Sequence, residues 1–411
     1  MKGDKVKNIN RRKFFTGVGS GLITLGVSRH LKGSANIPQT DSKNPAETGE
    51  PRIKKYNTIG KTGIKTSDII FGATSFFSAS VVKYAYDLGV TVFDTAENYM
   101  GGRAEEMFGQ ALKGLRDKVS IITKHYGNRT PASPVNKQQL FEKFNASLKR
   151  LQTDYVDIAF IHSLDDEADV NRFLQNDDLM SGYAQLKKEG KVRFTGFSTH
   201  NAKFFLEQGL KPEFAEFAQV IMFMYNHMEG KEIEPLIKQI HDKGIGTIAM
   251  KTLAGGQQGN LKTFMNQDTN YPQTALAWVL GNPNIDCAVI SMRSFSHVEE
   301  YVSASGRRLK REDLALLKEY SRQVDNTYCR VTCKKCEPSC PHHVAISDVM
   351  RFEMYFENYG HEKTAIENYA LLDDPRKPKN CANCSGHCNI ACPFGIKVQD
   401  RLIHADEILH V

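Results

Sequence analysis

The sequence repeats one unit eight times: a short apolar run, a polar turn, and then, in several units, a segment whose apolar residues recur with the period of a helix. Apolar runs of this kind are typical of parallel strands, which are buried on both faces. Strands that alternate with helices predict an α/β protein whose sheet closes into a (β/α)8 TIM barrel. The predicted strands cover residues 69–74, 90–94, 119–124, 156–162, 192–198, 218–225, 245–251 and 285–291, and the clearest helices cover 102–115, 135–151, 233–243 and 272–280.

Four polar residues stand at or just after the ends of the second, third and fourth apolar runs: Asp94, Tyr99, Lys124 and His162. The carboxyl ends of barrel strands meet at one mouth, so these side chains are expected to lie together. An ammonium group beside a tyrosine favours its phenolate form, a carboxylate can hold the ammonium in place, and a histidine can bond a substrate oxygen. Such a set is suited to moving a proton to or from a carbonyl oxygen while a separate donor supplies hydride.

The segments around these residues resemble the aldo-keto reductase superfamily. The resemblance rests on VFDTA at 92–96, GRAE at 102–105, IGKTG at 59–63 and GFS at 196–198, together with the four polar residues. It spans roughly residues 55–305 and implies a barrel enzyme that interconverts a small-molecule carbonyl and an alcohol with NAD(P)H. By this resemblance Tyr99 is the general acid or base, Lys124 tunes it, Asp94 orients Lys124, and His162 positions the carbonyl.

The resemblance also implies a set of cofactor-binding residues. Ser198 and Gln219 are expected at the nicotinamide amide, and two loops are expected near the phosphates and ribose. The loop residues are Ala254, Gly255, Gly256, Ser291, Met292, Arg293 and Ser294. Two positions depart from the family pattern: Thr199 replaces the usual asparagine, and Met250 replaces the aromatic residue that commonly stacks under the nicotinamide. These departures weaken the case for ordinary nicotinamide binding and leave the proton-transfer residues unchanged.

Eight of the nine cysteines form two quartets near the C-terminus, each followed by proline. Their members are Cys329, Cys333, Cys336 and Cys340, then Cys381, Cys384, Cys388 and Cys392. The pattern resembles the paired cysteine runs of bacterial ferredoxins, in which the fourth cysteine of each run serves the other cluster. This resemblance implies two 4Fe-4S clusters, one on Cys329, Cys333, Cys336 and Cys392 and one on Cys381, Cys384, Cys388 and Cys340. Each quartet is one residue longer than the ferredoxin spacing, so the pairing stays open, and four disulfides or two zinc sites also satisfy the count. The ninth cysteine, Cys287, lies in an apolar run and is predicted to be buried.

The first 35 residues account for the whole formal net charge of +7. The remainder is formally neutral and gives no electrostatic reason to bind nucleic acid or anionic lipid. A basic start, an apolar stretch over 14–27 and small residues at 33–35 are typical of a signal peptide. NRRKFF at 10–15 resembles a twin-arginine signal, which implies the twin-arginine translocase as a partner and a periplasmic destination. A basic amphipathic helix is the alternative interpretation.

The predicted order is a signal peptide over 1–35, a linker over 36–52, the barrel over 53–308 and a mainly helical ferredoxin-like domain over 309–411. No apolar stretch reaches the roughly 20 residues of a membrane span. The leading hypothesis is an exported aldo-keto reductase-like oxidoreductase. Free nicotinamide cofactor is not expected outside the cytoplasm, so a redox partner is a second possible source of electrons. The alternative hypothesis is a non-enzymatic electron-transfer or docking subunit that uses the barrel as a scaffold.

Changing both Arg11 and Arg12 to Lys is expected to retain the precursor in the cytoplasm, because the resemblance to a twin-arginine signal depends on this pair. Cell fractionation with an antibody against the chain measures the outcome. Unchanged export of the double variant would contradict the interpretation.

Overall fold

The computed structural model describes residues 50–75, 77–126, 135–256, 264, 270–330 and 333–410. The predicted signal peptide and most of the predicted linker lie outside these residues. All the described residues fall within one compact unit.

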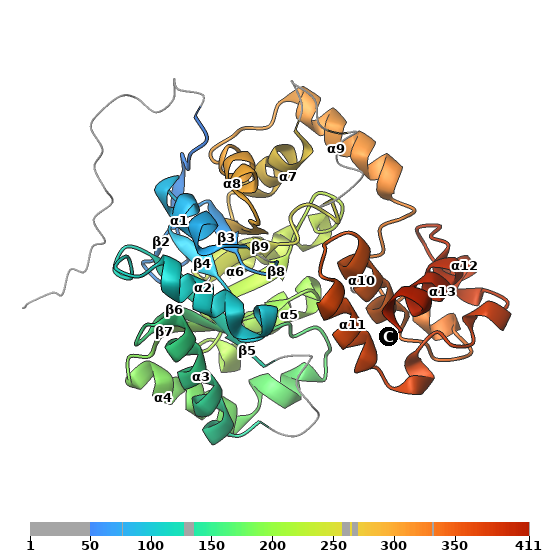
Figure 1. Cartoon of the computed structure of the whole chain (residues 1–411), viewed down its shortest axis with the longest axis horizontal. Coiled ribbons are helices and arrows are strands. Elements are labelled where there is room, and N and C mark those ends of the chain that lie inside the picture. Colours follow the sequence, from blue (N-terminus) through green and yellow to red (C-terminus); the bar gives the residue numbers. More distant parts are fainter. Residues whose placement is uncertain are drawn as a thin grey trace, which may run out of the picture. The chain divides into compact units, whose positions relative to one another are not determined.

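Eight parallel strands form a closed barrel, as the sequence predicts (Figure 1). Their order around the barrel is β10-β3-β4-β5-β6-β7-β8-β9. The strands are β3 (Ile69–Gly72), β4 (Val92–Asp94), β5 (Ser120–His125), β6 (Val156–Ile161), β7 (Val192–Thr199), β8 (Val220–Met224), β9 (Gly246–Met250) and β10 (Cys287–Ser291). All eight predicted strands are confirmed, with ends that differ by a few residues.

Helices cover the outside of the barrel and follow the strands in turn. They are α1 (Ala79–Asp87), α2 (Arg103–Ala111), α3 (Lys137–Leu151), α4 (Asp177–Lys188), α5 (Ala202–Gly209), α6 (Glu234–Asp242), α7 (Tyr271–Leu280) and α8 (Phe295–Val302). The four helices predicted from the sequence correspond to α2, α3, α6 and α7. Each of these eight helices buries apolar residues against the strands, which gives the strands the second buried face that their composition requires.

A second, smaller apolar cluster fills the barrel interior and includes Ile70, Ile122, Phe160 and the predicted buried cysteine, Cys287. The packing between strands is tight at Gly196 in β7, where an added Cβ would lie 1.7 Å from the Val220 carbonyl oxygen. The strands can therefore approach this closely only because residue 196 has no side chain.

A short hairpin, β1 (Tyr56–Thr58) and β2 (Lys65–Ser67), closes the amino-terminal end of the barrel. Ile59 and Ile64 in its turn belong to the interior cluster. The Gly60 N–H donates to Asp286 just before β10, at 2.9 Å. The opposite end, where the strands finish, is therefore the mouth that can hold chemistry.

The part of the chain after the barrel is helical, as predicted (Figure 1). Its helices are α9 (Arg311–Val324), α10 (Ile346–Glu357), α11 (Glu362–Ala370), α12 (His387–Ala391) and α13 (Val398–Leu409). Tyr320 of α9 stacks on Tyr271 of α7 with ring centroids 3.8 Å apart, so α9 packs directly on the barrel. We call residues 325–410 the C-terminal extension. Within the described chain, no helix combines the length and the apolar character needed to cross a membrane.

Candidate active site

The four predicted catalytic residues come together at the carboxyl ends of three adjacent strands and line one cavity. Asp94 is the last residue of β4, Lys124 lies near the end of β5, and His162 directly follows β6. Tyr99 begins a 3-10 turn (Tyr99–Gly102) after β4. That turn ends at Gly102 with φ 91°, a left-handed conformation that favours glycine, before α2 begins. The prediction that these side chains lie together is confirmed.

Lys124 and Asp94 form a buried ion pair. The Lys124 ammonium lies 2.6 Å from Asp94 Oδ1 and donates to the Thr95 carbonyl oxygen at 2.8 Å. The lysine side chain is 1% exposed. Burial lowers the pKa of Lys124, and the Asp94 carboxylate opposes that shift. Asp94 therefore fixes the ammonium and favours its charged form next to the cavity.

Tyr99 lies between this ion pair and His162. Its hydroxyl is 3.4 Å from His162 Nε2, and the two rings meet edge to face with centroids 5.4 Å apart. The Lys124 ammonium is 5.0 Å from the centre of the Tyr99 ring. The phenol thus faces a histidine on one side and a cation on the other, an arrangement in which it can exchange a proton with a bound oxygen atom.

The cavity has a volume of about 150 Å³, and the barrel supplies most of its wall. Ser198 and Ser291, two of the predicted cofactor-binding residues, line it. Met250 and Lys251 at the end of β9 line it too. These side chains surround the space in front of Tyr99, where a substrate or a nicotinamide ring would be placed.

The C-terminal extension completes the cavity wall, which the sequence analysis did not predict. Tyr355, Tyr359, His361 and Thr364 all line the cavity. The Lys251 ammonium lies 4.7 Å and 4.9 Å from the ring centres of Tyr355 and Tyr359. His361 Nε2 is 2.6 Å from Ser75 Oγ, which follows β3. A segment distant in sequence therefore packs onto the barrel mouth.

The prediction that Gln219 contacts the nicotinamide is wrong. Gln219 precedes β8, so it lies at the amino-terminal end of the barrel, away from the cavity. Its amide oxygen accepts from Lys187 Nζ at 2.7 Å and from the Thr195 N–H at 3.2 Å. Met222, which pairs with Ser198 across β7 and β8, is the β8 residue that lines the cavity.

The predicted phosphate loop, Ala254, Gly255 and Gly256, is covered by aromatic side chains. The Tyr320 hydroxyl donates to the Ala254 carbonyl oxygen at 3.1 Å. An added Cβ on Gly255 would lie 2.9 Å from the Tyr328 ring, and the Gly255 backbone bonds the Tyr359 hydroxyl. Ala254, Gly255 and Gly256 line a second cavity of about 860 Å³. Residues of the C-terminal extension, including Cys329, form another part of its wall.

The other predicted loop also differs from expectation in part. Ser291 lines the catalytic cavity, whereas Met292 is buried in the core. Ser294 caps the amino-terminus of α8, where its hydroxyl accepts from the His297 N–H at 3.3 Å. Arg293 is partly buried between them. The predicted cofactor contacts of these four residues stay predictions.

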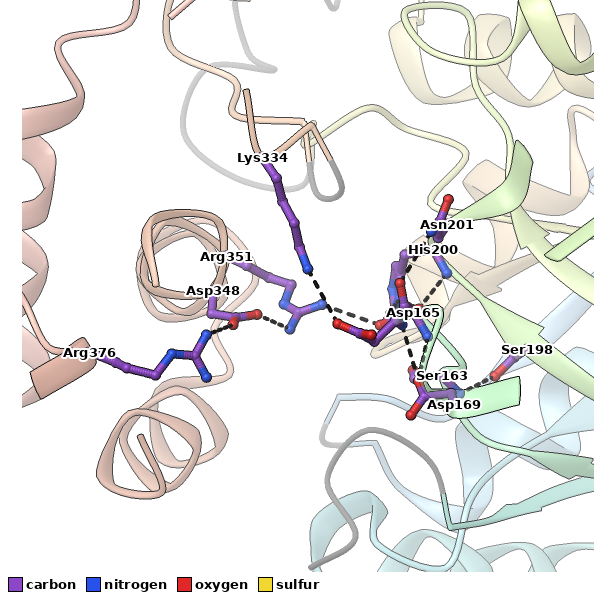
Figure 2. Close-up of polar contacts among 11 residues, drawn as sticks. Ser163, Asp165, Asp169, Ser198, His200, Asn201, Lys334, Asp348, Arg351 and Arg376 are labelled. Carbon is purple, nitrogen blue, oxygen red and sulfur yellow. Dashed lines mark hydrogen bonds and ion pairs between the residues drawn. The ribbon is translucent and has the colours of Figure 1, made fainter. Parts of the chain in front are cut away.

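A chain of polar contacts joins the cavity to the C-terminal extension (Figure 2). The Asp165 carboxylate lies 3.1 Å from His200 Nδ1 and 3.4 Å from Arg351 Nη1 of α10. Arg351 also donates to Asp348 at 2.8 Å. Burial opposes ionisation of Asp165, but His200 and Arg351 outweigh it and hold the pKa of this carboxyl well below its usual range. Sequence reasoning missed this contact because its members are far apart in the chain.

Cysteines of the two quartets are electrostatic neighbours of one another, and Cys336 is also a neighbour of Cys388. Burial raises the pKa of Cys329 and of Cys381, each to about 12, and nearby thiols add to both shifts. The thiols near Cys329 are Cys336, Cys333 and Cys392, and those near Cys381 are Cys340, Cys388 and Cys384. No disulfide joins any of the nine cysteines in the structure. Among the described residues, no group of three or more histidine, cysteine or acidic side chains is arranged to hold a metal ion.

The fold and the cavity define a class: a parallel α/β barrel whose mouth carries a tyrosine, a lysine, an aspartate and a histidine suited to proton transfer. Residues 69–272 match the sequence model of the aldo/keto reductase family. The barrel is thus an aldo/keto reductase family domain, and the protein is an oxidoreductase of the aldo/keto reductase type.

Known proteins of similar sequence and structure agree with this assignment. L-galactose dehydrogenase of Arabidopsis thaliana is 27% identical over 286 residues, which cover 61% of this chain and 88% of that protein. The aldo-keto reductase YhdN of Bacillus subtilis is 26% identical, over 63% of this chain and 91% of that protein. A solved aldo-keto reductase from Klebsiella pneumoniae in complex with NADPH is 26% identical, with a TM-score of 0.53, and the match covers 65% of this chain and 95% of that one.

Tyr99→Phe is expected to lower kcat for carbonyl reduction by about 10²- to 10⁴-fold, because it removes the hydroxyl that donates the proton. The ring and its contacts with His162 and Lys124 remain, so the thermal midpoint of unfolding should not change. Steady-state kinetics and thermal denaturation measure the two quantities. Tyr84→Phe, which removes a hydroxyl bonded to Glu299 on the outer surface, is the matched control. Full activity in the Tyr99 variant would contradict the assignment.

Proposed function

We propose that this protein is an NADP(H)-dependent oxidoreductase that interconverts a carbonyl and an alcohol, and that it is exported and carries two 4Fe-4S clusters in its C-terminal extension. The proposed reaction rests on one observation: the buried ion pair of Lys124 and Asp94 lies beside Tyr99 and His162. The NADPH bound to the Klebsiella pneumoniae relative supports the choice of cofactor.

In the direction of reduction, the Tyr99 hydroxyl donates its proton to the carbonyl oxygen as negative charge develops there. His162, 3.4 Å from that hydroxyl, bonds the same oxygen and fixes its position. Lys124 stabilises the phenolate that remains, and Asp94 holds Lys124 in place. A reduced nicotinamide, when bound, supplies the hydride.

The cavity residues fit a nicotinamide ring better than they fit a whole dinucleotide. Ser198 and Ser291 can bond polar groups of the ring or ribose, and Met222 and Met250 offer apolar contact. The volume of about 150 Å³ is below the roughly 300 to 1,000 Å³ of sites for larger ligands. The predicted phosphate loop at 254–256 does not line this cavity and instead lines the second one, of about 860 Å³.

The proposed cofactor is tested by titrating the purified protein with NADPH and NADH while Trp278 fluorescence is followed, and by assaying reduction of test aldehydes. NADPH is expected to quench the fluorescence and to support turnover. Tyr359→Phe should tighten NADPH binding about fivefold, since it frees the Gly255 backbone at a gain of ~1 kcal/mol. Tyr320→Phe, which loses its bonds to the Ala254 carbonyl oxygen and to Tyr271 but leaves the Gly255 backbone unchanged, should bind NADPH like the natural chain. Redox cycling of iron without nucleotide binding would instead favour an electron carrier.

The thiols that neighbour Cys329 and Cys381 support the proposed clusters. Cys329 has Cys392 of the second quartet as a neighbour, and Cys381 has Cys340 of the first, as in two-cluster ferredoxins, where the fourth cysteine of each run serves the other cluster. The resemblance of the N-terminus to a twin-arginine signal supports the proposal further, because that route exports folded, cofactor-loaded proteins.

The pairing of ligands gives a sharp test of the clusters. Iron and sulfide analysis with electron paramagnetic resonance on anaerobically purified protein should show two clusters. Cys392→Ser and Cys329→Ser should each remove or alter the same resonance signal, because both are proposed ligands of one cluster. The double variant should therefore lose no more iron than either single variant. Cys340→Ser should affect the other signal, and Cys287→Ala, at a cysteine outside the quartets, should affect neither. Zinc in place of iron, or additive losses in the double variant, would refute the proposed sites.

A further inference from the structure

Two segments of the barrel mouth, the loop that follows β6 and the end of β7, are joined by hydrogen bonds. The Ser163 N–H donates to Ser198 Oγ at 2.9 Å, and the Leu164 N–H donates to the Ser198 carbonyl oxygen at 2.8 Å. The His200 N–H donates to Asp165 Oδ1 at 2.7 Å. The place of Ser198 in the cavity wall therefore depends on the loop after β6.

Ser163 has a left-handed backbone conformation, with φ 52°, which residues other than glycine rarely adopt. Such a conformation is strained and persists only where the surrounding contacts fix it. The bond from the Ser163 N–H occupies an acceptor site on Ser198 Oγ and leaves the hydroxyl proton for another partner (Figure 2). Among the described residues, none accepts that proton. Ser198 lines the cavity and is 1% exposed, so the proton is available to an acceptor bound there.

Asp165 anchors the loop after β6, because it accepts hydrogen bonds from the end of β7 and from the C-terminal extension. Its Oδ2 lies 3.1 Å from the His200 ring Nδ1 and 3.4 Å from Arg351 Nη1 of α10 (Figure 2). The Asp169 carboxylate accepts from the Asp165 N–H at 3.0 Å, so two acidic groups lie close together. Burial alone would raise the pKa of Asp165, but His200 and Arg351 outweigh it and hold the pKa below its usual range. Arg351 thus offsets the repulsion between the two carboxylates and helps to fix the loop.

Arg351 is itself held in place and shielded from water. Its Nη2 donates to Asp348 at 2.8 Å, and the side chains of Arg351 and Asp165 are each 12% exposed. A second ion pair between the extension and the same loop joins Lys334 and Asp166 at 3.8 Å, but its side chains are 49% and 61% exposed. Solvent and salt screen an exposed pair of this kind, so it contributes little. Of these two pairs, the one formed by Arg351 therefore couples the extension to the loop.

We propose that Arg351 is a positioning residue for the cofactor: through Asp165 it fixes the Ser198 hydroxyl where it can donate to the carboxamide oxygen of the nicotinamide. This inference rests on the proposed NADP(H)-dependent reaction at the same cavity. The C-terminal extension thereby shapes the cofactor site through the loop after β6. Because hydride transfer depends on the alignment of the ring, a displaced Ser198 would impair the reaction as well as binding.

The first test compares the binding of NADPH with that of its thionicotinamide analogue, in which sulfur replaces the carboxamide oxygen. Sulfur is a weak acceptor, so the natural protein should bind NADPH about fivefold more tightly, as expected for one neutral hydrogen bond. Isothermal titration calorimetry measures both dissociation constants. Ser198→Ala should reduce this preference to less than about twofold, because the donor is lost.

Arg351→Met should reduce the preference for NADPH to a similar extent, because the loop then no longer fixes Ser198. Arg351→Lys, which keeps the cation, should restore part of the preference. The double variant with Ser198→Ala and Arg351→Met should show no further loss, since both changes remove the same interaction. Lys334→Met, which removes the exposed ion pair to the same loop, is the matched control and should keep the full preference. Equal weakening of both nucleotides in Arg351→Met, or additive losses in the double variant, would overturn the inference.

A second measurement needs no nucleotide. Hydrogen exchange followed by mass spectrometry should be about tenfold faster in Arg351→Met, in peptides that cover the loop after β6 and the end of β7. Peptides from β4 and β5 should exchange as in the natural protein, which separates this local effect from general unfolding. Unchanged exchange in the peptides that contain Ser163 and His200 would refute the role of Arg351. Faster exchange in this variant, with no binding of either nucleotide by the natural protein, would refute the proposed cofactor alone.

Discussion

The buried ion pair between Lys124 and Asp94 is the interaction on which the catalytic cavity depends. Removing two charges from water costs several kcal/mol for each ion, and only close, well-directed contacts offset that cost. Here the ammonium has carboxylate and carbonyl acceptors within 2.8 Å. These contacts exist because β4 and β5 are paired in a register that sets Asp94 beside Ile122, two residues before Lys124. The barrel therefore specifies the chemistry through strand register, and loss of either charge would leave the other uncompensated.

The C-terminal extension changes what this cavity can admit. Tyr355 and Tyr359 lie beside Lys251, and His361 bonds Ser75, so side chains of the extension cover part of the mouth. Exclusion of water strengthens the electrostatic contacts among the four catalytic residues, Asp94, Tyr99, Lys124 and His162. The same packing covers the loop at 254–256, where the phosphates of a dinucleotide would bind. The closed arrangement at the tyrosine and lysine thus favours the proton-transfer step.

Sequence patterns predicted the barrel well because each strand carries its own signal in consecutive residues. The positions of Asp94, Lys124 and His162 followed, since strand ends in a parallel barrel must converge. Gln219 failed because a shift of three residues along β8 moves a side chain from the mouth to the opposite end, and the apolar run contains no marker of that register. Contacts such as Arg351 with Asp165 were not predictable at all. They depend on how the extension packs on the barrel, which neither segment encodes locally.

Contacts connect the cysteine quartets with the cavity wall. Through these contacts the proposed clusters can have a structural role, which does not require electron transfer to the cavity. Glu337, inside the first quartet, accepts from the backbone and hydroxyl of Ser347 at the start of α10, at 2.8 Å and 2.7 Å. Gln399 of α13 donates to the carbonyl oxygens of Cys381 and Cys384, and α13 packs on α10. Clusters that fix these loops would therefore fix α10, and with it Arg351 and the tyrosines of the cavity wall. Because a cluster passes single electrons whereas carbonyl reduction needs two, this structural coupling accounts for clusters beside a reductase more simply than electron transfer does.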